Sequence, residues 1–210
     1  MMDTIQRHPP VQQTYAAYTQ QGFLLREVGL VAERLLAGVT EAELKQEVLE
    51  DDLFQLASAA SRKTALTAIR QRLEGVPSSM LTLLSEGSLD LRRLTNTYLI
   101  LLKHRLLREF IAEVVLEAAS RLSYTVPQAE VNAFMVFKRN QVPEIEGWSE
   151  ATVGKVRSSL VNLCVNAGLL EKVAAGWSIQ TQHVPAALRE ELASAQRQKF
   201  LRLLLDPEAI

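Results

Sequence analysis

The side chains best suited to catalysis or metal binding in this sequence are three histidines and one cysteine, and their spacing predicts neither activity. His8, His104 and His183 are far apart along the chain and match no HExxH or Cys-His pattern of a zinc site. Cys164 lies on the apolar side of a predicted helix, where a buried free thiol is expected. The sequence contains no glycine-rich phosphate loop, dinucleotide-binding fingerprint or nucleophile elbow. We therefore expect a protein that is not an enzyme and that needs no metal or cofactor.

A predicted helix over residues 149–166 has a polar side suited to nucleic-acid contact. At about 100° per residue, its apolar side chains share one face, which must be buried; they are Val153, Val156, Leu160, Leu163, Cys164 and Ala167. The opposite face holds small residues together with Lys155, Ser158 and Asn162. Small residues permit close approach to a groove, and the three polar side chains offer hydrogen bonds to phosphates or base edges. Arg157 lies nearer the buried face and would reach a phosphate only by extending its stem outward.

Gly154 is an unusual residue within this helix, because glycine destabilises a helix interior by about 0.5–1 kcal/mol relative to alanine. Close approach to a nucleic-acid backbone would offset that cost, and so would packing of this face against the N-terminal helices. Modules of this kind also serve as protein-docking domains, so the pattern leaves both alternatives open. The hairpin predicted after the helix adds little positive charge, since Lys172 is its basic residue, and Trp177 is expected in the core.

Charge is segregated along the first half of the chain, although the net charge is only −1. Eight acidic and two basic residues lie between Glu27 and Asp52, whereas nine basic and three acidic residues lie between Arg62 and Arg108. Basic side chains that converge on one face would attract phosphates despite this overall neutrality. The alternative is that the two stretches form ordinary surface ion pairs with each other. The basic residues expected to support contacts with a DNA backbone are Arg62, Lys63, Arg92, Arg93, Lys103 and Arg105.

The elements that must position these residues are mostly helical. Apolar residues recur at three- and four-residue steps from Phe23 to Gly38, and Thr40 with Glu43 forms a capping-box pattern at the start of the next helix. Further helices are predicted over residues 58–73, 79–84 and 88–122, the last with a bend near His104.

The last third of the chain predicts a different arrangement. A helix over residues 128–140 follows Pro127, and a turn over residues 142–148 separates it from the helix that Ser149 caps. Two strand-like pieces and a final helix come next, over residues 169–173, 177–180 and 186–205. Helix, turn, helix and hairpin is the order of a winged helix-turn-helix.

We therefore predict a mainly α fold with three parts. Residues 1–21 are polar and contain prolines, and are expected to form a flexible tail. Residues 22–125 form an N-terminal helical bundle as the body, and residues 126–210 form a winged helix-turn-helix-like module with a short β-hairpin and a C-terminal helix.

Composition places the chain among soluble globular proteins. Its hydrophobic fraction of 48% and charged fraction of 22% lie near the averages for folded domains. No apolar run approaches the roughly 20 residues needed to cross a bilayer, so no membrane span is predicted. A single cysteine permits no internal disulfide, and the N-terminus shows no secretory leader, so we expect a reducing cytoplasm.

Several short segments have the pattern of a known family: Leu53-Phe54-Gln55-Leu56 with Ser61-Arg62, Arg105-Leu106-Leu107 with Phe110, and Trp148–Thr152 leading to Ala167–Leu170. They resemble the BrxA family, small accessory proteins of bacterial BREX phage-exclusion systems, over nearly the whole chain. The resemblance implies a role in bacterial defence beside a methyltransferase and other BREX proteins. It also implies DNA binding and an all-helical body similar to the antitermination factor NusB. It assigns no contact residues, so the sites named above rest on the helix and charge arguments.

Three hypotheses for function follow. In the first, the chain is a non-enzymatic BREX component that binds double-stranded DNA mainly through a basic surface. In the second, it is a protein-interaction scaffold within the BREX complex without nucleic-acid contact, and the acidic stretch Glu41–Asp52 suits a basic partner. The third is RNA binding, suggested only by the likeness to NusB. The preferred DNA sequence, the BREX protein contacted and a homo-oligomeric state are left open by the sequence.

Overall fold

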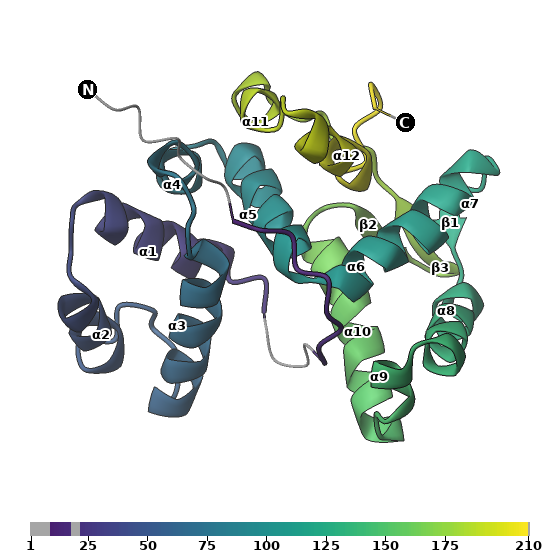
Figure 1. Cartoon of the computed structure of the whole chain (residues 1–210), viewed down its shortest axis with the longest axis horizontal. Helices are drawn as coiled ribbons and strands as arrows, with labels where there is room; N and C mark the ends of the chain where they lie inside the picture. The colour runs from purple at the N-terminus through teal and green to yellow at the C-terminus, as the bar shows by residue number, and fades with distance from the viewer. Residues whose placement is uncertain (1–8, 18–21, 210) are drawn as a thin grey trace. The chain divides into compact units, whose positions relative to one another are not determined.

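The computed structural model describes residues 9–17 and 22–209, which form two compact units. The first unit ends at Leu102 and the second continues from Lys103, with residues 12–17 belonging to the second (Figure 1). The described chain is mainly helical with a small antiparallel sheet, as predicted. Residues 103–125, expected in the N-terminal body, fold with the C-terminal part instead. Residues 1–8 and 18–21 of the predicted tail lie outside the described residues.

The first unit is built from helices. Its elements are α1 (Leu25–Leu36), α2 (Glu41–Leu49), α3 (Ala59–Leu73), α4 (Ser78–Ser85) and α5 (Leu89–Lys103). α1 packs against α4 and α3, and α2 packs against α3. Every residue of α5 from Leu94 to Leu102 is buried.

The predicted caps explain where these helices begin. Thr40 Oγ1 accepts the backbone N–H of Glu43, and Glu43 Oε2 accepts that of Thr40 at 2.8 Å, which confirms the capping box. Ser58 and Ser88 accept backbone N–H groups in the first turns of α3 and α5. Gly38, just after α1, has a φ of 76°, the left-handed conformation that glycine adopts most easily.

A buried arginine holds the start of the first unit in place. Arg72 donates hydrogen bonds to the carbonyl oxygens of Gly22 and Phe23, at 3.0 and 2.8 Å, and to Asn96 Oδ1 at 2.9 Å. Burial lowers the pKa of its guanidinium to about 10. Arg72 has no ion pair with any described residue, so neutral oxygens alone satisfy its charge.

The second unit combines short helices with the sheet. Its elements are α6 (Arg105–Phe110), the π-helical turn η1 (Ile111–Val115), α7 (Leu116–Ser120), β1 (Thr125–Val126), α8 (Gln128–Gln141), α9 (Pro143–Glu146), α10 (Glu150–Asn166), β2 (Leu170–Val173), β3 (Gly176–Ile179), α11 (Ala186–Glu191) and α12 (Ala195–Leu203). β3 lies between β1 and β2 and is antiparallel to both, with Trp177 opposite Val126 and Lys172. α10 packs against β2 and α8, and α8 packs against η1. Among the described helices none is long and apolar enough to cross a membrane.

The prediction of one continuous C-terminal helix over residues 186–205 is wrong. The chain forms two helices, α11 and α12, because its end folds back on the segment that leaves the sheet. Arg189 pairs with the buried Asp206 at 2.6 Å, and the backbone N–H of Gln182 donates to Leu205 O at 3.0 Å. A straight 20-residue helix would span about 30 Å and could not return to Gln182. Two short elements, α9 and β1, were also not predicted.

His104 produces the predicted bend between α5 and α6. Its φ and ψ of −117° and 86° are not helical, and its Nδ1 accepts the backbone N–H of Leu107 at 3.2 Å, which caps α6. Burial, together with the Arg108 cation, lowers the pKa of His104 to about 3. The imidazole is therefore neutral in the folded protein at neutral pH.

We expect the folded state to lose stability in acid through His104. An unfolded histidine titrates near pH 6.5, so below that value the unfolded state binds a proton that the folded state binds only near pH 3. The loss is at most about 1.4 kcal/mol per pH unit across this window. The His104→Asn variant keeps a capping oxygen without titrating, so its unfolding free energy in urea should depend less steeply on pH than that of the wild type. The exposed His183→Asn variant is the control, and equal slopes for both variants and the wild type would contradict the burial of a neutral imidazole.

Candidate nucleic-acid interface

The outward face of α10 contains the residues that were predicted to meet nucleic acid. Ala151, Lys155, Ser158 and Asn162 are all exposed and follow one another along a single helix face. Lys155 forms no ion pair with any described residue. Ser158 Oγ donates to Gly154 O at 3.1 Å within the helix. The face therefore offers one unpaired cation and polar side chains to solvent.

The opposite face of α10 holds the helix in the second unit. Ser149 Oγ accepts the backbone N–H of Thr152 at 3.2 Å and starts the helix. Val156 and Leu160 are fully buried, and Cys164 is a buried free thiol, as predicted. Burial raises the pKa of this thiol, so it is neutral and unreactive. Among the described residues no three metal-ligating side chains lie close enough to hold an ion.

Gly154 opens onto empty space. A Cβ built at this position has no heavy atom within 4 Å, apart from the backbone of its own helix turn. Packing against another described element therefore does not explain the glycine. No described contact offsets the helix-propensity cost of this glycine.

Arg157 lies beside the interior rather than on the outward face, as expected from its position on the helix. Its Nη1 donates to Asn132 Oδ1 on α8 at 2.9 Å. Gln128 Nε2, at the first position of α8, donates to the same oxygen at 3.0 Å. Trp177 is half-exposed on β3 and lines a hollow with these residues, so it is not the core aromatic that was expected.

Two of the predicted backbone-contacting arginines hold the first unit together. Arg62 pairs with Asp52 at 3.3 Å and donates to the carbonyl oxygens of Leu49 and Leu56, each at 3.2 Å. Arg92 Nε donates to Leu84 O at 2.9 Å, at the end of α4. Both guanidinium groups thus cap carbonyl oxygens that would otherwise lack donors.

The other predicted basic residues have diverse surroundings. Arg93 pairs with Asp90 at 2.5 Å, one turn earlier in α5. Lys63 is exposed and has no ion pair with a described residue, whereas Lys103 is half-buried. Arg105 belongs to the second unit, where it pairs with Glu109 at 2.8 Å. The six basic residues that were predicted to contact a DNA backbone are therefore divided between the two units. Of these six, Lys63 is the one that is exposed and has no ion pair with a described residue.

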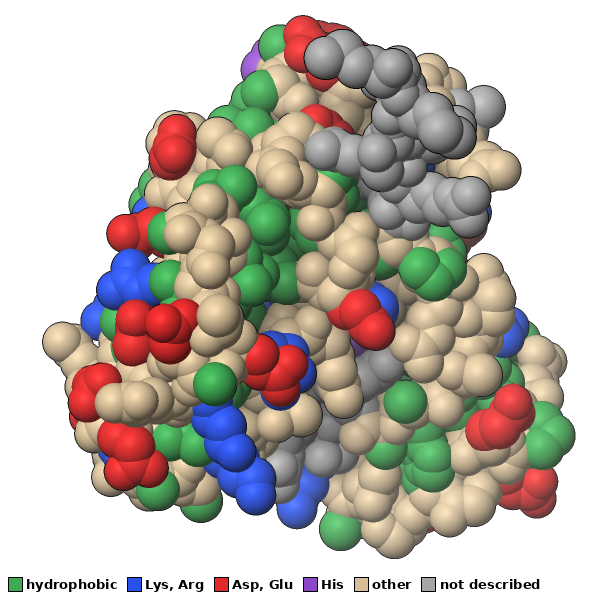
Figure 2. Space-filling view, turned by 60° about the vertical axis from the view of Figure 1, so that its left-hand side comes forward, with side chains coloured by type: hydrophobic (Ala, Val, Ile, Leu, Met, Phe, Trp, Pro, Cys, Tyr) green, Lys and Arg blue, Asp and Glu red, His purple; other side chains and the backbone are tan. Residues whose placement is uncertain are grey.

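The acidic and basic stretches of the first unit form ion pairs with each other. Asp52 pairs with Arg62, and Glu41 pairs with Arg70 at 2.6 Å, so the alternative expectation is confirmed for these residues. Figure 2 shows acidic and basic side chains intermixed on the face that it presents, without a broad field of either sign. The acidic and basic stretches are separate in the sequence, but their charges are mixed on this face of the surface.

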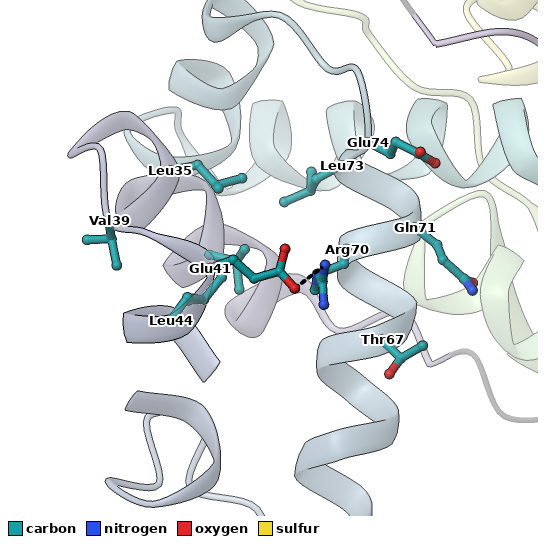
Figure 3. A pocket seen from close by; sticks show the side chains of 10 residues that line it. Leu35, Val39, Glu41, Leu44, Thr67, Arg70, Gln71, Leu73 and Glu74 are labelled. Atoms are coloured by element: carbon teal, nitrogen blue, oxygen red, sulfur yellow. Dashed lines mark ion pairs between the residues drawn. The ribbon is translucent and has the colours of Figure 1, made fainter. Parts of the chain in front are cut away.

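A groove lies between α1, α2 and α3 in the first unit. It has a volume of about 440 Å³, and the apolar part of its lining includes Val31, Leu35, Leu44 and Leu73. The ion pair between Glu41 and Arg70 spans the opening (Figure 3). The rest of its lining is polar and includes Glu41, Arg70 and Glu74.

A buried lysine that was not considered for the site positions α8. Lys138 Nζ lies 2.7 Å from Glu109 Oε2 and 2.6 Å from Glu113 Oε1. Burial alone would raise the pKa of Glu109, but hydrogen bonds from Lys138, Arg105 and Tyr15 outweigh it and lower the pKa. Burial and the bond to Glu109 raise the pKa of Tyr15 to about 12. Tyr15, part of the predicted tail, is thereby held against α6.

Comparison with known proteins identifies the family. The model of the BrxA family matches residues 14–196, which include all the interface residues discussed above. The chain belongs to the BrxA family. Relatives described as BREX protein BrxA come from Escherichia coli O9:H4 strain HS, 25% identical over 70% of this chain and 68% of the relative, and from Bacillus cereus strain H3081.97, 23% identical over 70% and 74%.

The BrxA-family fold also occurs in a solved structure of an uncharacterized protein from Magnetospirillum magneticum. The two structures superpose with a TM-score of 0.76 over 92% of this chain and 99% of that chain, at 17% sequence identity. At this identity the likeness concerns the fold alone.

Removing the buried lysine should destabilise the second unit strongly. In the Lys138→Met variant Glu109 and Glu113 lose their shared cation, and we expect a loss of about 3 kcal/mol, the lower end for breaking a buried pair because Glu109 keeps Arg105. The neighbouring Arg139→Met variant breaks an exposed ion pair with Glu150 and should cost at most about 1 kcal/mol. Chemical denaturation measures both unfolding free energies. Equal losses in the two variants would show that the ion pairs of Lys138 do not stabilise the second unit more than an exposed ion pair does.

Alanine at position 154 should stabilise this BrxA-family protein. The Gly154→Ala variant gains helix propensity in open space, so its unfolding free energy should rise by about 0.5–1 kcal/mol. The control is Gly29→Ala in α1, where the new Cβ would lie 3.2 Å from Leu84 O and against the Arg92 guanidinium, and where we expect destabilisation. A loss of stability in the Gly154→Ala variant would mean that the glycine has a structural role.

Proposed function

We propose that this chain is a non-enzymatic accessory component of a BREX phage-defence system, acts in the cytoplasm and binds duplex DNA through the outward face of α10. Its membership of the BrxA family and its relatives described as BREX proteins support the BREX role. The observation that supports DNA contact is the exposed, carboxylate-free row Ala151, Lys155, Ser158 and Asn162, with Gly154 open beside it.

The order of elements in the second unit supports a winged helix-turn-helix. A helix and a short strand, α7 and β1, precede α8, and α10 is followed by the hairpin of β2 and β3. β1 pairs with β3, so the hairpin is joined to the strand before the first helix of the motif. In such an arrangement the second helix, here α10, enters the major groove.

Contacts on the α10 face would be few and mostly with phosphates. Lys155 is the unpaired cation of this face, and Asn162 offers an amide to a base edge or a phosphate. Ala151 and Gly154 permit close approach because they add little or no side-chain volume. Among the basic residues of the first unit that were predicted to contact DNA, Lys63 is exposed and has no ion pair with a described residue, whereas Arg62 and Arg92 serve the fold and are weaker candidates.

Protein docking is a second candidate function, favoured by the groove between α1, α2 and α3. Its apolar lining and the acidic residues of α2 suit an amphipathic basic segment of another BREX protein. Complexes with BREX proteins that persist after nuclease treatment, from a chain that shifts neither duplex DNA nor RNA, would favour this function. Competition among duplex DNA, single strands and RNA tests the preference for duplex.

We expect the Lys155→Ala variant to bind duplex DNA several times more weakly than the wild type, with the slope of log affinity against log salt reduced by about one. The reason is the loss of one phosphate contact and its released counterion. Fluorescence anisotropy with a labelled duplex, between about 50 and about 200 mM salt, measures both quantities.

The control for this experiment is Lys45→Ala, which removes the same charge from an exposed position on α2. It should leave affinity and slope unchanged. Equal binding by the two variants, or a wild-type affinity indifferent to salt, would contradict DNA contact through α10.

A further inference from the structure

A polar cavity lies between α8, α10 and β3, beside the proposed DNA-binding face. It has a volume of about 270 Å³ and is lined by Gln128, Asn132, Arg157, Ser158, Val161, Asn162 and Trp177. Ser158 and Asn162 belong both to this lining and to the outward face of α10. The cavity is therefore continuous with that face and not a separate pocket in the core.

Hydrogen bonds within the lining orient the donors. Asn132 Oδ1 accepts from both Arg157 Nη1 and Gln128 Nε2, at 2.9 and 3.0 Å. Because both bonds go to the oxygen, the amide of Asn132 has its Nδ2 left to donate. Nε and Nη2 of Arg157 have no hydrogen-bond partner among the described residues. A fixed guanidinium edge is thus left available beside an amide donor.

The lining contains no carboxylate. Arg157 is its charged residue and forms no ion pair with a described residue, which contrasts with Arg62, Arg93 and Arg105. Trp177 adds an indole N–H, a group that only donates. A cavity with a positive charge and several donors, and without a competing anion, selects a negatively charged group with several acceptor oxygens.

We infer that this cavity is a phosphate site in which Arg157 is the principal donor. Its volume of about 270 Å³ leaves ample room for a phosphate-sized group. The identity of the phosphate rests on the proposed function. If the outward face of α10 binds DNA, the phosphate in the cavity belongs to the DNA backbone beside that contact. The same chemistry would bind the phosphate of a small free ligand.

Arg157 lies near the buried face of α10, where it would reach a phosphate on the outward face only by extending its stem. In the cavity that position is an advantage, because Asn132 holds the guanidinium in place before a phosphate arrives. A bidentate contact from a guanidinium that is already hydrogen-bonded loses less side-chain entropy than a single contact from an exposed lysine such as Lys155.

Trp177 provides a direct measurement of occupancy. The chain has two tryptophans, so the Trp148→Phe variant leaves Trp177 as the sole indole. We expect its fluorescence to change saturably on titration with inorganic phosphate at constant ionic strength, and not with chloride. In the same background, Arg157→Met should weaken phosphate binding at least tenfold, whereas Arg202→Met, which removes an exposed arginine of α12, should not.

A second variant avoids the risk that Arg157→Met fails to fold. Asn132→Asp is isosteric and places a carboxylate against the guanidinium, so it should preserve the contact and abolish phosphate binding. A saturable phosphate response that is absent in Asn132→Asp and Arg157→Met supports the site. No response in the wild type, or an equal response in Asn132→Asp, overturns it.

Duplex DNA titrations separate the sources of the phosphate. If Arg157→Met lowers DNA affinity about tenfold and reduces the salt slope by about one, the phosphate belongs to the backbone. If it leaves DNA binding unchanged while free phosphate binding is lost, the site serves a small phosphorylated ligand, and the proposed DNA contact through Lys155 stands by itself. If wild-type DNA binding is absent but phosphate still saturates, the DNA proposal fails and the cavity assignment holds.

Discussion

The arrangement of the second unit depends on one lysine ammonium that is buried between two carboxylates. Lys138 joins α8 to α6 and η1 through Glu109 and Glu113. A desolvated ammonium without these partners would cost several kcal/mol, so α8 has one favourable position on the helices beneath it. The rings of Phe110 on α6 and Phe134 on α8 pack edge to face, with 5.4 Å between their centroids. α10 packs on α8 and β2, and its buried residues, such as Val156 and Leu160, determine which face it presents to solvent.

Several basic residues serve the fold in ways that the sequence does not reveal. Guanidinium groups such as those of Arg72 and Arg92 donate to backbone carbonyl oxygens, which the planar fork of arginine matches well. Lysines such as Lys63 and Lys155 stay exposed, because a compact ammonium retains its hydration. A count of positive charges in the sequence therefore overstates the positive charge that remains unpaired on the surface.

Much of the fold was predictable because its signals are local. Ser149, Thr40 and His104 act within one turn of their own position, so a cap or a bend can be recognised from neighbouring residues. The exposed row on α10 follows from helical periodicity in the same way. The break between α11 and α12 depends on Asp206, which lies far along the chain from its partner, and the lining of the cavity unites three elements. Contacts of this kind have no periodicity that reveals them.

The small number of unpaired cations near α10 bears on how such a protein would act. Each phosphate that a protein neutralises on duplex DNA releases about 0.9 counterion, and this release supplies most non-specific affinity. Lys155 on the outward face and Arg157 in the adjoining cavity would account for about two such contacts. Binding limited to these contacts is weak and easily reversed at physiological salt. A component of that kind gains occupancy when a larger assembly holds it at high effective concentration near DNA. The charge distribution of α10 thus favours an accessory role over that of an independent, tightly binding repressor.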